Sequence, residues 1–373
     1  MEHDTAAAVK RYGTDLSGGA HASATPVSTR REEVRMTVCD APGKVYLFGE
    51  HAVVYGEPAV PAAIERRATV SAEPRDDDHV RVEAEDISLD GFTVEYAGGT
   101  DDRPDVDVPT PLVEAAMGYV DAAVRQARDA ANAPDAGFDI TVESDIPLGA
   151  GLGSSAAVVV AGIDAATRAL GEPLEPRELA DRAYRAEHEV QDGQASRADT
   201  FCSTMGGAVR VEGDDCDPID APNLPFVVGF DGGAGDTGEL VAGVGQLRDE
   251  YAFAADTITA IGDVVRAGED LLADADPGDA PSAALLSELG ELMDFNHGLL
   301  AALGVSARSL DTMVWAARDA GAHGAKLTGA GGGGCIVALD PSDETETALS
   351  FTQGCEETFR AALATEGVRV VEP

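Results

Sequence analysis

Residues Pro147-Leu-Gly-Ala-Gly-Leu-Gly-Ser-Ser-Ala-Ala157 place three alternating glycines and two serines between two regular segments. The alternating residues 138–144 predict a strand before them, and residues 154–170 predict a helix after them, with Ser154 or Ser155 as its N-cap. Glycines permit positive φ and let backbone N–H groups approach an anion closely. The start of a helix adds unpaired N–H groups and the positive end of the helix dipole. This order of elements therefore predicts a loop that binds phosphates, such as those of ATP.

A tight turn with a serine cap is the alternative interpretation, and one glycine alone would favour it. The loop is not a Walker A motif, because no Gly-Lys-Ser/Thr sequence ends it. The spacing of its third glycine also differs from the Rossmann fingerprint. A hydroxyl in the first turn of the helix, that of Ser155, is a suitable ligand for Mg²⁺ beside the phosphates.

A second glycine cluster spans residues 329–334 and matches Gly-x-Gly-x-x-Gly. Because the residues after it, Cys335-Ile-Val-Ala-Leu, are typical of a strand and not of a helix, the dinucleotide-binding context is absent. We expect a second close approach to a nucleotide or substrate here. The chain has only three lysines (Lys10, Lys44 and Lys326) against 23 arginines, and two of them lie in glycine-marked motifs. A functional reason is favoured for Lys44, whereas chance and function are both open for Lys326.

The remaining pattern mixes strands and helices, which predicts an α+β fold with two layered domains. We expect a disordered N-terminal extension at 1–35, an N-terminal domain at 36–222 and a C-terminal domain at 223–373. The predicted elements are a strand at 44–48, antiparallel strands within 68–97, a surface loop from 98 to 111, helices at 111–131 and 176–190, a strand at 208–211, helices at 250–274, 281–302 and 305–321, and then strands and a helix.

The formal net charge is −42, with 44% apolar residues. Nucleic acid and anionic membranes are excluded as partners, because both would repel such a chain. Either the chain is disordered or it is adapted to high salt, as in haloarchaea. Its apolar content and regular patterning reject disorder for most of its length. At molar salt the Debye length falls to about 3 Å, which screens the self-repulsion.

No run of 18 apolar residues exists, so no membrane span is expected, and residues 1–35 contain no signal-peptide core. The five cysteines fit neither a disulfide framework nor a zinc site, and the seven histidines are scattered. We therefore predict free thiols and a cytoplasmic protein.

Three motifs, in this order along the chain, resemble the signatures of the GHMP kinases. They are Ala41-Pro-Gly-Lys-Val-Tyr-Leu-Phe-Gly-Glu-His-Ala-Val-Val-Tyr-Gly56, the glycine loop at 147–157, and Lys326-Leu-Thr-Gly-Ala-Gly-Gly-Gly-Gly-Cys335. The resemblance spans about residues 38–372, and the run from Phe48 to Gly56 is typical of the branch whose substrate is mevalonate. It implies an N-terminal domain of the ribosomal protein S5 domain 2-like type, a C-terminal ferredoxin-like α/β sandwich, and a homodimer.

The resemblance also implies an activity, the ATP- and Mg²⁺-dependent phosphorylation of the primary 5-hydroxyl of (R)-mevalonate in isoprenoid biosynthesis. Asp199 would accept the hydroxyl proton, and Lys44 would stabilise the developing alkoxide and hold Asp199 ionised. Without the resemblance, a chain with 68 acidic residues favours interpreting Asp199 as a helix N-cap or a solvated carboxylate. The residues implied to bind ATP are Ser144, Gly149, Ala150, Gly151, Leu152, Gly153, Ser154 and Ser155, and those implied to bind mevalonate are Glu50, His51, Thr237 and Gly331. A histidine that only satisfies a strand end is the alternative for His51.

The Mg²⁺ ligands implied are Ser155 and a helix glutamate. In relatives that glutamate lies eleven residues before the aspartate, which here is His188. The loop at Asp192-Gly193 looks one residue longer than usual, so Glu187 is the expected ligand and Glu189 the alternate.

Other members of the superfamily are the main rivals to this assignment. Phosphomevalonate, homoserine and galactose kinases would share the glycine loops but not the whole first motif. Lys44 beside Gly49-Glu-His disfavours a diphosphomevalonate decarboxylase. Intact Lys44, Ser155 and Asp199 argue against an inactive sensor of the same fold.

Overall fold

The computed structural model describes residues 36–84, 92–97, 111–191, 193, 195–233 and 235–372. The predicted extension at 1–35, most of the predicted surface loop at 98–111 and Asp192 of the predicted longer loop lie outside this part of the chain. All described residues belong to one compact unit, residues 34–373.

The larger sheet is built around two long strands. Its strand order is β12-β1-β2-β5-β3-β4, and β6 pairs with β2 and β7. Its strands are β1 (Thr37–Phe48), β2 (Val60–Arg75), β3 (His79–Ala84), β4 (Phe92–Ala97), β5 (Gly137–Ser144), β6 (Ala208–Glu212), β7 (Asp215–Ile219) and β12 (Arg369–Glu372). The predicted strand at 44–48 is confirmed as the end of β1. Within residues 68–97 the antiparallel prediction holds for β3 and β4, but β5 lies between β2 and β3 and runs parallel to β3.

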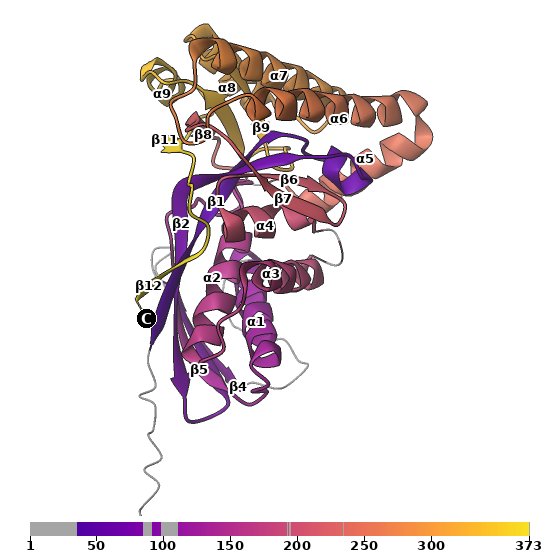
Figure 1. The fold of residues 1–373 in the computed structure, drawn as a ribbon. Helices are drawn as coiled ribbons and strands as arrows, with labels where there is room; N and C mark the ends of the chain where they lie inside the picture. The colour runs from indigo at the N-terminus through magenta and orange to yellow at the C-terminus, as the bar shows by residue number, and fades with distance from the viewer. Residues whose placement is uncertain are drawn as a thin grey trace, which may run out of the picture. The chain divides into compact units, whose positions relative to one another are not determined.

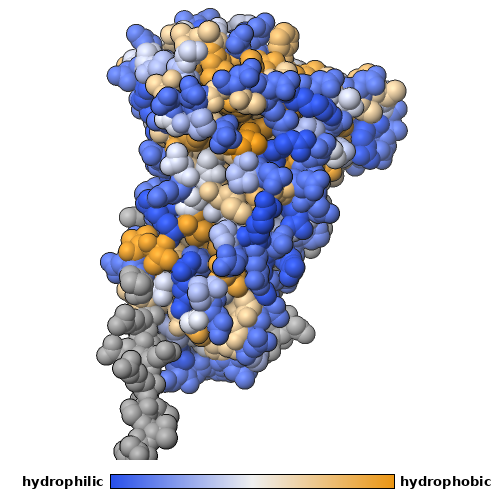
Figure 2. Space-filling view, viewed as in Figure 1, coloured by the Kyte–Doolittle hydropathy of each residue, from blue (hydrophilic) through white to orange (hydrophobic). Residues whose placement is uncertain are grey.

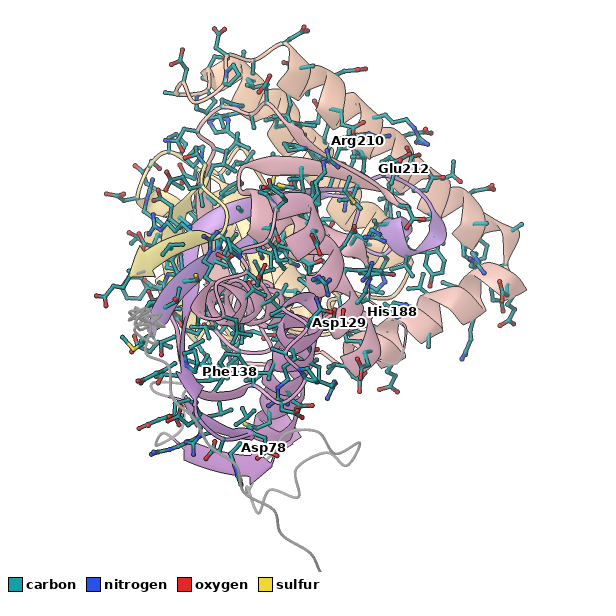
Figure 3. All side chains as sticks on the ribbon, turned by 60° about the horizontal axis from the view of Figure 1, so that its bottom comes forward. Asp78, Asp129, Phe138, His188, Arg210 and Glu212 are labelled. Carbon is teal, nitrogen blue, oxygen red and sulfur yellow. The ribbon has the colours of Figure 1, made fainter. Side chains whose placement is uncertain are left out.

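Helices cover one side of this sheet, as Figure 1 shows for α1, α2 and α3. They are α1 (Pro111–Ala130), α2 (Ser154–Ala169), α3 (Pro176–Val190) and the unpredicted α4 (Arg197–Met205). Small residues let α2 pack closely on the strands, since five alanines and one glycine along it are buried. Phe138, the second residue of β5 and labelled in Figure 3, is completely buried.

The second sheet is antiparallel, with strand order β11-β8-β10-β9. Its strands are β8 (Pro225–Phe230), β9 (Gly324–Thr328), β10 (Cys335–Leu339) and β11 (Glu357–Ala362), and its helices are α5 (Thr237–Glu250), α6 (Ala252–Ala273), α7 (Ala283–Ala302), α8 (Arg308–Asp319) and α9 (Glu344–Ser350). The helices predicted at 281–302 and 305–321 are confirmed. The helix predicted at 250–274 is α6, and the prediction missed α5, from which Tyr251 in extended backbone separates it.

The mixed architecture confirms the predicted α+β class. The boundary predicted at 222/223 falls between β7 of the larger sheet and β8, the first strand of the other sheet. It stays a prediction, because β12 returns from the C-terminus to pair with β1.

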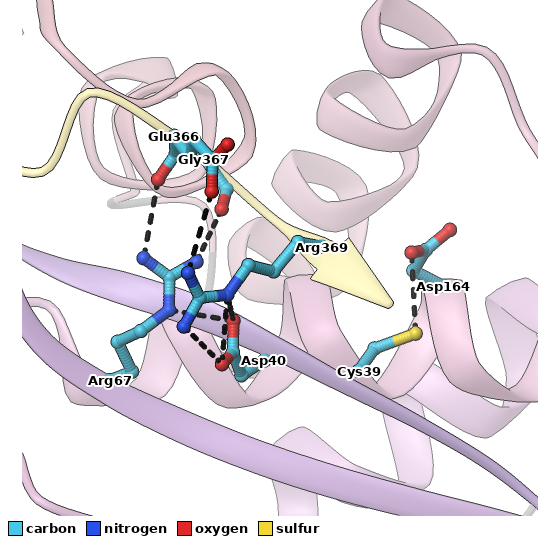
Figure 4. A network of polar contacts seen from close by, with 7 residues as sticks. All are labelled: Cys39, Asp40, Arg67, Asp164, Glu366, Gly367 and Arg369. Carbon is cyan, nitrogen blue, oxygen red and sulfur yellow. Dashed lines mark hydrogen bonds and ion pairs between the residues drawn. The ribbon is translucent and has the colours of Figure 1, made fainter. Parts of the chain in front are cut away.

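A buried carboxylate fastens this returning segment (Figure 4). Asp40 on β1 accepts hydrogen bonds from Arg67 Nε at 2.6 Å and from Arg369 Nε at 3.0 Å. Arg67 also donates to the backbone carbonyl oxygens of Glu366, at 3.2 Å, and of Gly367. Two arginines therefore share one acid and hold the C-terminal strand on the sheet.

The face of the protein in Figure 2 is mostly hydrophilic, in keeping with the acidic composition. All five cysteines are free thiols, as predicted. Among the described helices, none combines the length and the apolar character that crossing a membrane requires.

Candidate active site

The glycine loop between β5 and α2 has the backbone conformation that its sequence predicts. Gly149, Gly151 and Gly153 all have positive φ, at 69°, 79° and 74°. The predicted serine cap is wrong: Gly153 occupies the N-cap position, and no side chain caps the helix. The Ser155 hydroxyl donates to Glu187 Oε1 at 3.0 Å, and the buried Ser154 hydroxyl has no partner in the described part of the chain. The serines therefore face the site and not the helix backbone.

The second glycine cluster packs against this loop, backbone on backbone. A Cβ added to Gly151 would lie 3.0 Å from the Thr328 carbonyl oxygen, and one added to Gly329 would lie 2.9 Å from Gly151 Cα. On the other side, the Lys44 N–H donates to the Leu152 carbonyl oxygen at 2.8 Å. All three sequence motifs thus meet at one loop, and β10 follows the second cluster as predicted.

Lys44 and Asp199 form an ion pair where β1 meets α4. Lys44 Nζ lies 3.2 Å from Asp199 Oδ2 and donates to the Gly151 carbonyl oxygen at 3.0 Å. The lysine is 2% exposed, whereas the Asp199 side chain is 27% exposed. Ser196 is the N-cap of α4, so the N-cap interpretation of Asp199 is wrong. Asp199 presents a carboxylate at the edge of a cavity, with a fixed cation behind it.

A second carboxylate lies close by, on α3. Glu187 is 3% exposed, and burial together with the negative charge of Asp199 raises its pKa to about 8. Glu189, by contrast, points away, is exposed and pairs with Arg125 Nη2 at 2.9 Å. Of the two candidate glutamates, only Glu187 lines the cavity.

The oxygens of Glu187 and Ser155 suit a hard cation such as Mg²⁺. Mg²⁺ is usually held by one or two protein ligands together with substrate phosphates and water. The described residues accordingly contain no cluster of three or more His, Cys, Asp or Glu side chains arranged around a metal. A buried carboxylate with a raised pKa is also a group that a bound dication would stabilise in its ionised form.

Glu50 and Lys326 form a buried ion pair beside the part of the cavity that His51 lines. Their side chains are 1% and 0% exposed, and Lys326 Nζ contacts Glu50 Oε1 directly. Lys326 Nζ also donates to the carbonyl oxygens of Tyr46, at 3.3 Å, and Leu327, at 2.6 Å. Asn296 Nδ2 donates to Glu50 Oε2 at 3.4 Å. Burial raises the pKa of Glu50 and lowers that of Lys326.

His51 occupies a strained backbone conformation, with φ 60° and ψ −47°. Its Nε2 lies 2.7 Å from the Ala330 carbonyl oxygen, which can only accept, so Nε2 carries the proton. Burial lowers the pKa of His51, which favours the neutral ring. Nδ1 is then a buried acceptor with no partner among the described residues. The ring can thus accept a hydrogen bond from a substrate hydroxyl.

One cavity of about 530 Å³ connects these groups. Apart from the alternate Glu189, every residue that the sequence suggested for ATP, substrate, metal or catalysis lines it, including Ser144, Thr237 and Gly331. Ser144 lies at the end of β5, where its hydroxyl accepts from the Ile146 N–H at 3.2 Å, and Thr237 opens α5. One part of the cavity wall is apolar and is formed by Val82, Met117, Val142, Val158 and Val190.

Sequence reasoning missed several residues of the lining. Tyr46, Tyr119 and Thr328 all line the cavity and carry hydroxyl groups. Tyr46 follows Lys44 by two residues on β1, and in a strand alternate residues share a face. That periodicity is the signal that could have found Tyr46. Tyr119 and Thr328 carried no comparable signal.

Comparisons with known proteins agree with this geometry. The family models described as "GHMP kinases N terminal domain" and "GHMP kinases C terminal" match residues 118–207 and 282–351. A mevalonate kinase from Thermococcus gammatolerans is 40% identical over 336 residues, which are 90% of this chain and 98% of the relative. One from Pyrococcus horikoshii is 40% identical over 343 residues, 91% of this chain and 99% of the relative. The crystal structure of the Methanococcus jannaschii mevalonate kinase superposes with a TM-score of 0.71 at 27% identity, covering 88% of this chain and 98% of that one.

Proposed function

Because the chain belongs to the GHMP kinases and, within them, to the mevalonate kinases, it phosphorylates mevalonate, and we propose that the cavity at Lys44 and Asp199 carries out this transfer from ATP. The observation that carries the proposal is the 3.2 Å pair between Lys44 Nζ and Asp199 Oδ2 beside the glycine loop. A partly exposed carboxylate, a buried ammonium group and an anion-binding loop then face one space. Phosphoryl transfer requires positioning and charge neutralisation more than covalent catalysis.

Asp199 is the proposed general base. Its carboxylate accepts the proton of the primary 5-hydroxyl as the hydroxyl oxygen forms a bond to the γ-phosphorus of ATP. The bond from the γ-phosphorus to the bridging oxygen breaks, so ADP leaves and 5-phosphomevalonate forms. Lys44 stabilises negative charge on the attacking oxygen, and it is already held in place by Gly151 and Asp199.

The glycine loop, Gly149 to Ser155, is the proposed cradle for the triphosphate. Its positive-φ glycines and the start of α2 supply backbone N–H groups and the positive end of a helix dipole. Ser155 and Glu187 are the proposed holders of Mg²⁺, which supplies charge neutralisation on the phosphate oxygens when bound. The apolar part of the cavity suits the adenine base, with Ser144 beside it.

The part of the cavity that His51 lines is the proposed mevalonate site. His51 Nδ1 offers an acceptor for a substrate hydroxyl, while Thr237 and Gly331 line the same region. Glu50 lines it too, but its carboxylate oxygens are engaged by Lys326 and Asn296. We therefore expect Glu50 to shape this part of the site together with Lys326.

Three wider proposals rest on composition and on family. The charge of −42 supports a protein that works at high salt. The free thiols support a reducing, cytoplasmic setting. A homodimer is proposed from the resemblance alone.

The test of this function measures ADP release in molar KCl with ATP, Mg²⁺ and mevalonate. We expect turnover by the wild type, and a fall in kcat of about 10²–10⁴-fold in Asp199→Asn, since the amide cannot take the proton. Asp181→Asn is the matched control, because Asp181 on α3 is exposed and pairs with Arg197 on α4. Near-normal turnover in Asp199→Asn would reject Asp199 as the base while leaving the substrate assignment standing.

A further inference from the structure

A buried tyrosine hydroxyl contacts the proposed base from the strand that carries Lys44. Tyr46 is 6% exposed, and its hydroxyl donates to Asp199 Oδ1 at 2.9 Å. Lys44 Nζ lies 3.2 Å from the other oxygen of the same carboxylate, Oδ2. The two donors come from alternate positions of β1, and the carboxylate comes from α4. The plane of the carboxylate is thus fixed by one strand, with a hydrogen bond on Oδ1 and an ion pair on Oδ2.

The tyrosine is itself held firmly. Its backbone N–H donates to Thr328 Oγ1 at 2.8 Å, and its carbonyl oxygen accepts from Lys326 Nζ at 3.3 Å. Both partners lie on β9, the strand before the second glycine cluster. Burial and the negative charge of Asp199 raise the pKa of Tyr46 well above its usual range. The phenol therefore keeps its proton and remains a donor whenever Asp199 is ionised.

The ring of Tyr46 also contacts the catalytic lysine. Lys44 Nζ lies 4.3 Å from the ring centroid, within the range of a cation–π interaction. The three N–H bonds of the ammonium group can thus face the Gly151 carbonyl, the Asp199 carboxylate and the ring. One side chain contacts both members of the proposed acid–base pair.

We infer that Tyr46 is a positioning residue for phosphoryl transfer, which holds Asp199 through Oδ1 and seats Lys44 against its ring. The inference rests on the proposed role of Asp199 as base. A carboxylate free to rotate about its terminal bond would spend part of its time turned away from the substrate hydroxyl, whereas a carboxylate held on both oxygens is already oriented. The hydroxyl acts through Asp199 and need not touch the substrate.

The test is a double-mutant cycle between Tyr46→Phe and Asp199→Asn, read as steady-state kinetics in molar KCl. Phenylalanine keeps the ring beneath Lys44 and nearly the same volume, so only the hydroxyl is lost. We expect kcat to fall about 10-fold to 100-fold in Tyr46→Phe, as for loss of a hydrogen bond to a charged group, with KM for ATP and mevalonate changed less than about threefold. In the Asp199→Asn background, the same tyrosine change should have almost no effect on the residual rate.

Two further variants complete the design. Tyr46→Leu also removes the ring, so we expect a larger loss of kcat than in Tyr46→Phe. Tyr184→Phe is the control, since the Tyr184 ring contacts His188 and Arg197 and does not line the cavity; it should leave kcat unchanged. Thermal unfolding of each variant in the same buffer verifies that the compared proteins are folded.

The possible outcomes separate the two ideas. Wild-type kcat in Tyr46→Phe, or an equal loss in both Asp199 backgrounds, would overturn the positioning role and leave the base in place. A small effect of Asp199→Asn alone would instead reject the proposed base, and the positioning role with it. Loss of kcat in Tyr46→Phe that disappears in the Asp199→Asn background would establish the inference.

Discussion

Replacing Lys326 by methionine should destabilise the protein in a strongly pH-dependent way. Lys326 and Glu50 are the two fully enclosed charges beside the proposed mevalonate site, and Lys326 Nζ donates to Glu50 and to the Tyr46 and Leu327 carbonyl oxygens. Methionine fills a similar volume without the charge. The substitution leaves the Glu50 carboxylate buried beside an apolar side chain, with Asn296 as its remaining side-chain donor.

Two independent arguments give the size of the effect. Removal of one partner from a buried ion pair typically costs about 3–5 kcal/mol. Alternatively, Glu50 can take up a proton on folding, which at pH 7 costs about 1.36 kcal/mol for each pH unit above an ordinary value near 4.3, or about 3.7 kcal/mol. Protonation of Glu50 sets an upper limit on the destabilisation, because Glu50 becomes neutral once keeping its charge would cost more than this. The two values agree, so we expect a loss of about 4 kcal/mol at pH 7.

The same argument fixes the sign of the pH dependence. Burial already raises the pKa of Glu50 in the wild type, and loss of Lys326 raises it further. A carboxyl group whose folded pKa lies above its unfolded pKa favours the folded state at low pH, and this contribution is lost as the pH rises through the folded value. At pH 5 protonation costs only about 1 kcal/mol, so the destabilisation should shrink to roughly 1–2 kcal/mol.

The assay is urea unfolding in molar KCl at pH 5 and pH 7, since guanidinium would itself change the ionic strength. The double variant Lys326→Met/Glu50→Gln removes both charges and should regain most of the stability at pH 7. A loss below about 1 kcal/mol at pH 7, a loss independent of pH, or no recovery in the double variant would refute the reasoning.

Two other outcomes follow from the described contacts. Glu187→Gln removes a charged oxygen and should raise the apparent KM for Mg·ATP by about 10-fold to 100-fold. Glu189→Gln loses only an exposed ion pair with Arg125 and should change this KM less than about twofold. Equal effects of the two variants in a Mg²⁺ titration would contradict the assignment of Glu187 as the metal ligand. The midpoint of thermal unfolding should rise by several degrees between about 0.1 M and 1 M KCl, because salt screens the repulsion within a chain of charge −42. An equal rise in sucrose of the same osmolality would point to solute exclusion instead.

Conformational preferences of short stretches of sequence predicted much of this site. Alternating glycines between a strand and a helix have few conformational uses, and the loop at 149–153 has the left-handed glycines that its sequence implied. Helices α1 and α3 follow apolar periodicity, and α1, α3 and α7 begin close to their expected positions. The wrong cap at Ser154 or Ser155 has a clear cause. Capping preference assumes that a serine serves its own helix, but here Gly153 takes the N-cap position and the Ser155 hydroxyl turns to Glu187.

The features that were missed depend on contacts between distant segments. Helix α5 has a single buried residue, Val244, and its three glycines (Gly238, Gly243 and Gly245) lower its helix propensity, so its sequence predicts a helix only weakly. The hydrogen bond between Tyr46 and Asp199 joins residues 153 positions apart, and the contact of Gly151 with Gly329 joins two loops from different sheets. Contacts between segments so far apart in the sequence cannot be predicted from any single short stretch of it.

The structure gives a physical reason why lysine, and not arginine, occupies positions 326 and 44. Lys326 has three N–H donors, and the structure surrounds them with three acceptors, on Glu50, Tyr46 and Leu327. An arginine would bring five donors in a rigid plane to a place with room for a compact charge, and at least two donors would stay buried without partners. Lys44 Nζ also has three neighbours, which are the Gly151 carbonyl oxygen, the Asp199 carboxylate and the ring of Tyr46. Arginine supplies nearly all cations elsewhere in this acidic chain, but in these two enclosed positions the number of available acceptors favours lysine.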